Sequence, residues 1–274
     1  MNWIQAISKL NSQAQGYVLV TVLATKGSIP RDRGTKMVVS ADDSFDTIGG
    51  GALEYKAIEL ARELLDKNET SPSQCTETFN LGKDLKQCCG GVVDVFFEVF
   101  PASNFNIVLF GAGHIGQSLI KILEDVDCQV SWFDSRSELF PESVAKSSPS
   151  HIQTHTMTRP ELAVESCKPN SYYLVMIHDH ALDQEFCEAI LSRADSRYCG
   201  LIGSATKGLK FRQRLLKKSF TQQELEQLTC PIGLSGLKSK KPMEIAVSIS
   251  AELLRLRDMK QSQIHNSQLI KMIK

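Results

Sequence analysis

Hydrophobic and polar positions follow two different periods in the first hundred residues of the chain. Apolar residues recur at helical spacing in residues 3–10 and 52–65, which predicts two amphipathic helices. Runs rich in β-branched and aromatic residues predict strands at residues 17–24, 35–40, 76–81 and 92–100. The segment Pro101-Ala-Ser-Asn104 is typical of a linker. These patterns predict an N-terminal mixed α/β domain over residues 1–103.

The pattern changes after this linker, because short apolar runs begin to alternate with helical stretches. Strands are expected at residues 107–110, 128–134, 151–157, 172–177 and 198–202. Helical stretches lie between most of them, as parallel β-α-β units require. Thr221-Gln-Gln-Glu224 forms a capping box, and Pro242 occupies a first helical position before an amphipathic helix at residues 243–257. Residues 104–274 are therefore expected to form a Rossmann-like parallel-sheet domain with a helical C-terminal part, which makes the fold class α/β.

Charge and composition narrow the possible partners. The 274 residues include 31 lysines and arginines and 31 aspartates and glutamates, so the chain has no positive excess to bind a nucleic-acid backbone. The first fifteen residues lack the basic and apolar regions of a signal peptide. Residues 17–24, the most apolar stretch, are far shorter than the roughly 20 residues that span a bilayer. We therefore expect a soluble, cytoplasmic protein that binds neither nucleic acid nor membrane, with its eight cysteines mostly reduced.

The sharpest local motif is the glycine-rich segment Gly111-Ala-Gly113-His114-Ile-Gly116. It follows an expected strand and opens a helix, and Asp134 ends the next strand 18 residues past Gly116. In a dinucleotide-binding fold the glycines admit a pyrophosphate and the acidic residue contacts a ribose hydroxyl. A Rossmann domain that binds no nucleotide, and keeps the glycines for tight turns, is the alternative. The choice between NAD and NADP stays open, because Asp134 suits a free 2′-hydroxyl whereas Arg136, two residues later, suits a 2′-phosphate.

A second glycine segment, Gly49-Gly50-Gly51, precedes the helix expected at residues 52–65. Free amides at a helix N-terminus attract anions, and the basic residues Arg31 and Lys36 come shortly before it in the sequence. This combination favours a phosphate-bearing ligand. The alternative is a flexible glycine turn beside a solvated basic hairpin.

The third motif is Cys88-Cys89-Gly90-Gly91. Adjacent cysteines do not easily bind one metal together, but one thiolate facing a glycine turn is a soft ligand for a transition metal or an acceptor of sulfur. The alternative is a pair of buried cysteines entering a strand.

The fourth motif, His178-Asp179-His180, follows an expected strand at its carboxyl end. Ligands of open α/β sheets bind at this edge, so the motif is a candidate ligand loop. A solvated loop is the alternative.

Taken together, these motifs resemble those of the XdhC/CoxI family, accessory proteins that mature xanthine dehydrogenase. The resemblance covers nearly the whole chain and includes the four motifs above. Further segments that carry it are Ala24-Thr-Lys-Gly-Ser-Ile-Pro-Arg31, Gly34-Thr-Lys-Met37, Gly200-Leu-Ile-Gly-Ser204, Cys230-Pro-Ile-Gly-Leu234 and Lys241-Pro-Met-Glu-Ile-Ala246.

This resemblance implies a function that the motifs alone do not give. Such proteins bind the molybdenum cofactor, molybdopterin, and shield it while a cysteine desulfurase replaces an oxo ligand by sulfur. They then deliver it to the molybdenum-binding subunit of xanthine dehydrogenase. The family motif points to Cys89 as the residue nearest the molybdenum, with Cys88 as its neighbour. We also expect a homo-oligomer; the resemblance does not say which domain holds the cofactor.

Three functions remain open at this point. The first is a cofactor-binding chaperone with no turnover of its own and no catalytic residue. The second is an NAD(P)-dependent oxidoreductase that uses the Gly111–Gly116 loop, although no catalytic arrangement accompanies that loop. The third is a structural metalloprotein that uses histidines and cysteines.

Overall fold

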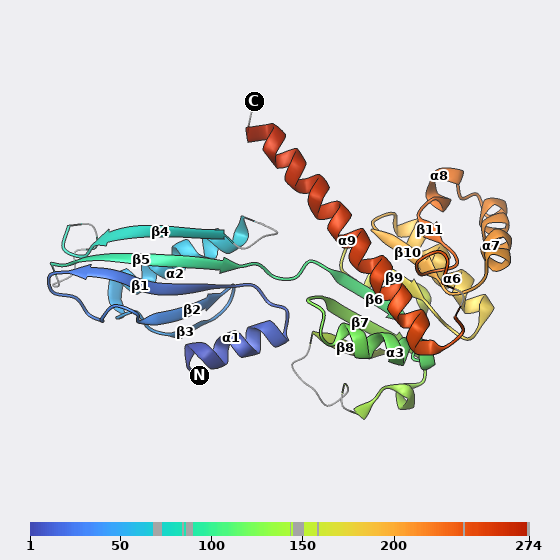
Figure 1. Ribbon diagram of the computed structural model, residues 1–274, viewed down its shortest axis with the longest axis horizontal. Helices are drawn as coiled ribbons and strands as arrows, with labels where there is room; N and C mark the ends of the chain where they lie inside the picture. Colours follow the sequence, from blue (N-terminus) through green and yellow to red (C-terminus); the bar gives the residue numbers. More distant parts are fainter. Residues whose placement is uncertain are drawn as a thin grey trace. The chain divides into compact units, whose positions relative to one another are not determined.

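The computed structural model of the chain consists of two compact units, Met1–Asn104 and Phe105–Lys274 (Figure 1). It describes all residues except 68–72, 84, 86–89, 143, 145–150, 158, 238 and 273–274, and the described side chains end at residue 259.

The N-terminal unit is built on one five-stranded antiparallel sheet with the order β3-β2-β1-β5-β4. Its strands are β1 (Tyr17–Lys26), β2 (Lys36–Ser40), β3 (Ser44–Asp46), β4 (Ser73–Asn80) and β5 (Val92–Phe100). Alternate residues of β5 are buried and half-buried, as expected when successive side chains point to opposite faces of a sheet.

Two helices cover opposite faces of this sheet (Figure 1). Helix α2 (Gly51–Asp66) packs against the face that carries Val20 and Phe97 and forms the larger apolar core. Helix α1 (Trp3–Ser12) packs against the other face, where Tyr17 is buried. Because successive strand residues point to opposite faces, the apolar residues of one face pack against α2 and those of the other face pack against α1.

The C-terminal unit contains a six-stranded parallel sheet with the order β11-β10-β9-β6-β7-β8. Its strands are β6 (Asn106–Phe110), β7 (Gln129–Asp134), β8 (Ile152–Thr156), β9 (Tyr172–Val175), β10 (Tyr198–Leu201) and β11 (Leu228–Thr229). The chain runs from β6 outward to β8 and then returns to β9 on the other side of β6. This is the strand order of a doubly wound Rossmann fold, and its topological switch point lies between β6 and β9.

Helices cover both faces of the parallel sheet (Figure 1). On one face α3 (His114–Leu123) and α9 (Pro242–Met272) pack against each other and share one core. On the other, α5 (Pro160–Glu165), α6 (His180–Arg193) and α7 (Ala205–Lys217) share a second core. The short elements are η1 (Ser137–Leu139) and α8 (Gln222–Leu225). The predicted α/β fold class, with a Rossmann-like second part, is confirmed.

Most predicted element ends fall within a few residues of those observed, and the exception is the last helix. The capping box at Thr221 and Glu224 is present, and Pro242 is the first residue of α9. However, α9 continues to Met272, well past the end at residue 257 that the apolar pattern predicted. Across the described ranges, no helix has both the length and the apolarity needed to cross a bilayer.

Candidate functional site

The glycine-rich loop after β6 has the geometry of a phosphate-binding turn. A Cβ on Gly111, whose φ is +114°, would lie 2.4 Å from the carbonyl oxygen of Met176 at the end of β9. A Cβ on Gly116 would lie 2.4 Å from the carbonyl oxygen of Gly111. Gly113 has no atom within 4 Å of its Cβ position, so a ligand has open access to the backbone there. The first and third glycines permit close packing and the second permits close approach, as in dinucleotide-binding loops.

Hydrogen bonds from three directions fix the loop. The Gly111 amide donates to the Phe133 carbonyl at 2.8 Å, and the Trp132 indole donates to the Gly111 carbonyl at 3.1 Å. The Gln117 side chain donates to the Ala112 carbonyl at 3.1 Å. His114, the first residue of α3, is exposed beside this loop.

Asp134, the expected ribose contact, is turned into the protein. Its side chain accepts hydrogen bonds from the Ala112 amide at 2.6 Å and from the Arg136 guanidinium at 2.9 and 3.0 Å. Burial raises the pKa of Asp134, but the hydrogen bonds from Arg136 and Ala112 outweigh it and hold the pKa below its ordinary value. The carboxylate therefore anchors the loop, and a ribose hydroxyl would have to displace Arg136 to reach it.

The three residues of the His178-Asp179-His180 segment make different contacts. Asp179 caps α6, because its side chain accepts a hydrogen bond from the Ala181 amide at 2.8 Å. His180 Nδ1 lies 3.6 Å from Asp183 Oδ2, and His178 is exposed. Among the described residues, no three histidine, cysteine, aspartate or glutamate side chains are grouped so that they would hold a metal ion.

A buried ion pair that the sequence patterns did not identify lies beneath this segment. Asp183 is fully buried, and its Oδ2 lies 2.6 Å from Lys207 Nζ. Lys207 also donates to the Ile202 carbonyl at 2.9 Å, and Asp183 accepts from the Ile177 amide at 3.3 Å. Burial raises the pKa of Asp183, and the hydrogen bond from Lys207 opposes this shift. The pair fastens the start of α7 to the carboxyl ends of β9 and β10.

In the N-terminal unit, two glycine-containing segments lie against each other. A Cβ on Gly91 would lie 2.4 Å from the Ser28 carbonyl oxygen and 2.8 Å from the Lys26 carbonyl oxygen. A Cβ on Gly27, whose φ is +83°, would lie 3.3 Å from the Cα of Gly91. The turn after β1 therefore packs directly on the backbone that enters β5, and only glycine fits at position 91. Gly90 beside it has nothing within 4 Å of its Cβ position.

A third segment, Gly49-Gly50-Gly51, meets the same turn. A Cβ on Gly49, whose φ is +129°, would lie 2.6 Å from Pro30 Cγ and 3.4 Å from Arg31 Cγ. Gly50 has φ +71° and open space at its Cβ position. The turn that follows β1 is thus contacted by two segments, one about 20 residues and the other about 60 residues further along the sequence.

Glu54 in the first turn of α2 organises the glycine triplet. One oxygen of its carboxylate accepts from the Ile48 and Gly50 amides, each at 3.1 Å, and from the Thr47 hydroxyl. No side chain caps α2, because its N-cap is Gly50. Among the amides that were expected to face an anion, that of Gly50 is therefore bound to a carboxylate of the same chain, and that of Gly49 donates to the Thr47 hydroxyl at 3.0 Å.

The other residues expected at the cofactor site do not all lie beside the glycine segments. Lys36 donates to the Thr21 hydroxyl at 2.8 Å, and its Nζ lies 5.8 Å from the centre of the Trp3 ring. Arg31 is exposed beside Gly49. Cys88 and Cys89 lie outside the described residues.

Comparison with known proteins identifies both parts of the chain. The XdhC Rossmann domain matches residues 107–253, more than half of the chain, and the XdhC and CoxI family matches residues 10–80. The chain belongs to the XdhC and CoxI family. In this family member the first match includes the Gly111 loop and the Asp183–Lys207 pair, and the second includes the turn after β1 and the glycine triplet.

Individual relatives are distant from this XdhC and CoxI family member. The uncharacterized protein YqeB of Escherichia coli K12 is 26% identical over 264 residues, which are 94% of the chain and 47% of YqeB. The chain therefore spans about half the length of this curated relative. A Bacillus halodurans structure described as a xanthine dehydrogenase is 19% identical, with a TM-score of 0.48 over 94% of the chain and 96% of its own. ChuY of E. coli CFT073 is 15% identical, with a TM-score of 0.34 over 54% of the chain and 89% of its own.

Proposed function

We propose that the protein is a maturation factor that binds the molybdenum cofactor during its sulfuration and delivers it to xanthine dehydrogenase. Family membership supports the accessory role, and one structural observation supports the location of the site. This observation is that Gly49 packs on Pro30 and Gly91 packs on the Lys26 and Ser28 carbonyls, so both glycine segments contact the turn after β1. The cofactor is expected to bind there, in the N-terminal unit.

The residues around this turn fit the chemistry of the cofactor. Gly50 and Gly90 have no neighbouring atoms at their Cβ positions, so a bulky ligand has room to contact the backbone at both places. Arg31 supplies a cation for the cofactor's phosphate, and Cys89, bonded to Gly90, supplies a soft sulfur ligand near the molybdenum. The bound cofactor would supply the molybdenum centre on which oxygen is exchanged for sulfur.

Glu54 limits where the phosphate binds. Its carboxylate already accepts from the Ile48 and Gly50 amides, so a phosphate placed on those two donors would meet a like charge. We expect the phosphate to lie between Arg31 and the first turn of α2, where no side-chain cap covers the amides. Lys36 contributes less to this site, because its ammonium group is already bound to Thr21.

The glycine-rich loop of the C-terminal unit supports a second, separate proposal of nucleotide binding. The open backbone at Gly113 favours a pyrophosphate such as that of NAD(P). The bidentate bond between Asp134 and Arg136 disfavours the ribose contact typical of NAD. We therefore keep NAD(P) as a candidate ligand and propose no hydride-transfer reaction.

The proposed role names the partners. The molybdenum-binding subunit of xanthine dehydrogenase would accept the loaded cofactor, and a cysteine desulfurase would supply the sulfur. We also propose that the protein is a homo-oligomer. We propose a cytoplasmic location, because the protein would encounter the cofactor and the acceptor enzyme there.

Co-expression with xanthine dehydrogenase, followed by anaerobic purification, tests the proposed function. We expect the purified protein to contain molybdenum and pterin, and to raise dehydrogenase activity only when the cysteine desulfurase is present. The isolated protein should oxidise no substrate. NAD-dependent turnover by the isolated protein would contradict this proposal and favour an oxidoreductase.

A further inference from the structure

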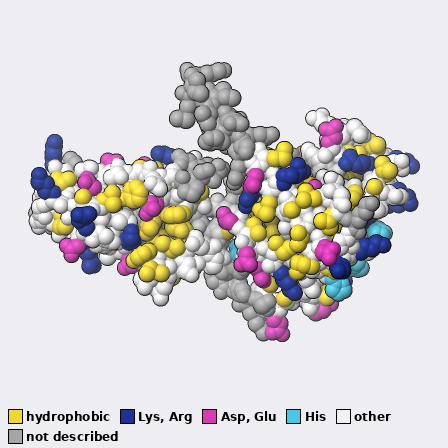
Figure 2. Space-filling model, viewed as in Figure 1, with side chains coloured by type: hydrophobic (Ala, Val, Ile, Leu, Met, Phe, Trp, Pro, Cys, Tyr) yellow, Lys and Arg dark blue, Asp and Glu magenta, His cyan; other side chains and the backbone are white. Residues whose placement is uncertain are grey.

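A cavity of about 500 Å³ opens at the carboxyl end of β10, where α6 and α7 begin. Its lining comes from the start of α6, the turn after β10 and one face of α7. The lining residues are His180, Gly203, Ser204, Thr206, Lys207, Lys210, Phe211 and Arg214. Figure 2 shows lysine and arginine side chains gathered at this edge of the C-terminal unit, with histidine side chains near them.

The charge of the cavity is strongly one-sided. Lys207, Lys210 and Arg214 follow one another at spacings of three and four residues, so they lie on the same face of α7. The residues that line the cavity include no aspartate or glutamate. In the described part of the chain, neither Lys210 nor Arg214 forms an ion pair with a carboxylate.

Lys207 differs from the other two cations because it is held in place. Its Nζ lies 2.6 Å from the buried carboxylate of Asp183 and 2.9 Å from the Ile202 carbonyl oxygen, and the lysine side chain is only 15% exposed. Asp183 balances this one charge and fixes Lys207 at the base of the cavity. The charges of Lys210 and Arg214 remain unbalanced at its wall, where Arg214 makes only a hydrogen bond of 3.4 Å to Gln184.

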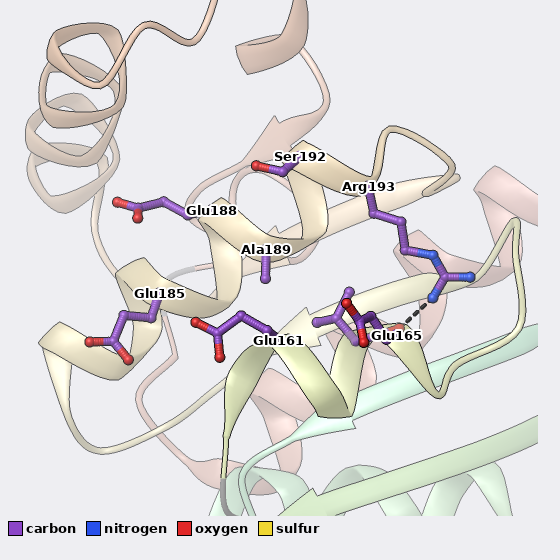
Figure 3. Close-up of a pocket in the computed structure, with 8 residues that line it drawn as sticks. Glu161, Glu165, Glu185, Glu188, Ala189, Ser192 and Arg193 are labelled. Atoms are coloured by element: carbon purple, nitrogen blue, oxygen red, sulfur yellow. Dashed lines mark hydrogen bonds between the residues drawn. The ribbon is translucent and has the colours of Figure 1, made fainter.

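The basic lining distinguishes this cavity from the groove beside it. A neighbouring groove of about 480 Å³ between α5 and α6 carries the opposite charge. Figure 3 shows Glu161 and Glu165 of α5 at this groove together with Glu185 and Glu188 of α6. Helix α6 therefore separates an acidic groove from a basic cavity, and an anionic ligand would be directed to the basic one.

We propose that this basic cavity binds the phosphate group of a small-molecule ligand. It is a concave space with converging cations and the Thr206 hydroxyl, and it lies at the sheet edge where α/β folds bind ligands. Its charge suits a phosphate and opposes the positively charged ring of an oxidised nicotinamide. The site requires neither the molybdenum cofactor nor Cys89, so it is independent of the function proposed above.

Titration of the full chain with inorganic phosphate at constant ionic strength tests the site. We expect the wild-type protein to bind phosphate saturably. Calorimetry measures this binding, and chemical-shift changes should be confined to α7 and the turn after β10. Lys210→Glu should weaken this binding by about tenfold or more, because it removes a charge-assisted contact and adds repulsion.

Lys121→Glu is the matched control, since Lys121 is an exposed residue of α3 on the opposite face of the sheet. It makes the same change in net charge and should leave phosphate binding unaltered. Absence of saturable binding to the wild type, or equal weakening by the two variants, would overturn the proposal.

Adenosine diphosphate distinguishes the two sources of such a phosphate. If the nucleotide binds more tightly than phosphate, and is weakened both by Lys210→Glu and by Gly113→Asp, the cavity holds one end of a nucleotide that also reaches the Gly111 loop. If both probes bind alike and Gly113→Asp has no effect, the cavity holds an independent phosphate group.

Discussion

Arg136 closes over the carboxylate of Asp134, with its Nε 2.9 Å from Oδ1 and its Nη2 3.0 Å from Oδ2. The same carboxylate accepts the Ala112 amide. The loop after β6 and the loop after β7 are thus joined through one side chain. The sequence motif assigns this acidic residue to a ligand. In the structure it instead accepts hydrogen bonds from a backbone amide and from an arginine of the same chain.

Replacing this carboxylate should lower stability in a pH-dependent way. Asp134→Asn keeps the shape but removes the charge, and we expect a loss of about 1–3 kcal/mol near neutral pH because hydrogen bonds to a charged group are lost. The folded pKa lies below the ordinary value of 3.8, so the wild-type advantage is present above that value. It should disappear as the pH falls through the lowered pKa and Asp134 becomes protonated.

Denaturant unfolding of the wild type and the variant, followed from neutral pH down to about pH 3, measures this difference. Asp125→Asn, a change at an exposed aspartate near the end of α3, is the control and should show no comparable loss. A stability difference that stays constant over the acidic range would contradict the assigned role of the charge.

The contact between Gly91 and the turn after β1 predicts opposite results for two neighbouring glycines. Gly91→Ala places a methyl group 2.4 Å from the Ser28 carbonyl oxygen, so it should destabilise the N-terminal unit by about 1–3 kcal/mol. Gly90→Ala meets no atom within 4 Å and should change stability little. Hydrogen exchange of the β1 and β5 amides reports on this unit, and similar protection in both variants would refute the contact.

Molybdenum content tests the role assigned to the cysteine motif. We expect Cys89→Ala to remove most of the bound cofactor while thermal unfolding stays unchanged. Cys88→Ala should have a smaller effect, because the family resemblance points to Cys89 as the residue nearest the molybdenum. Wild-type molybdenum stoichiometry in Cys89→Ala protein, measured after anaerobic purification, would exclude this thiol as a ligand.

The glycine triplet allows a test in which only charge changes. Gly50 has φ +71° and ψ −171°, a backbone conformation that only glycine adopts readily, so asparagine and aspartate are strained there to a similar degree and differ in charge. Gly50→Asp should weaken cofactor binding by about tenfold or more relative to Gly50→Asn, because only the aspartate repels a phosphate. Equal affinities of the two variants, measured with the extracted cofactor, would place the phosphate elsewhere.

The sequence predicted the features that depend on neighbouring residues and missed those that depend on distant ones. Strand β5 was predicted from its apolar pattern with both ends correct, and the glycine spacing after β6 predicted the switch-point loop. Strands β3 and β11 were missed, because elements of three and two residues are too short to show a period. The Asp183–Lys207 pair joins residues 24 positions apart, and no local pattern indicates that they meet.

The glycine triplet shows a further limit of motif reading. Its amides were correctly expected at the start of a helix, yet the motif did not reveal that Glu54 accepts two hydrogen bonds there. A carboxylate four residues after Gly50 was interpreted only as a favourable charge in the first helical turn. The competing intramolecular acceptor becomes evident only from the geometry.

The packing of Gly91 on the Ser28 and Lys26 carbonyls also constrains how related sequences diverge. These obstacles are backbone atoms, so no side-chain replacement in the turn makes room for a larger residue at position 91. Gly200 differs, because a Cβ there would meet the side chains of Ile232 and Tyr198, each at 2.6 Å. Position 200 is therefore expected to covary with positions 198 and 232, whereas position 91 changes only where the turn after β1 changes in length.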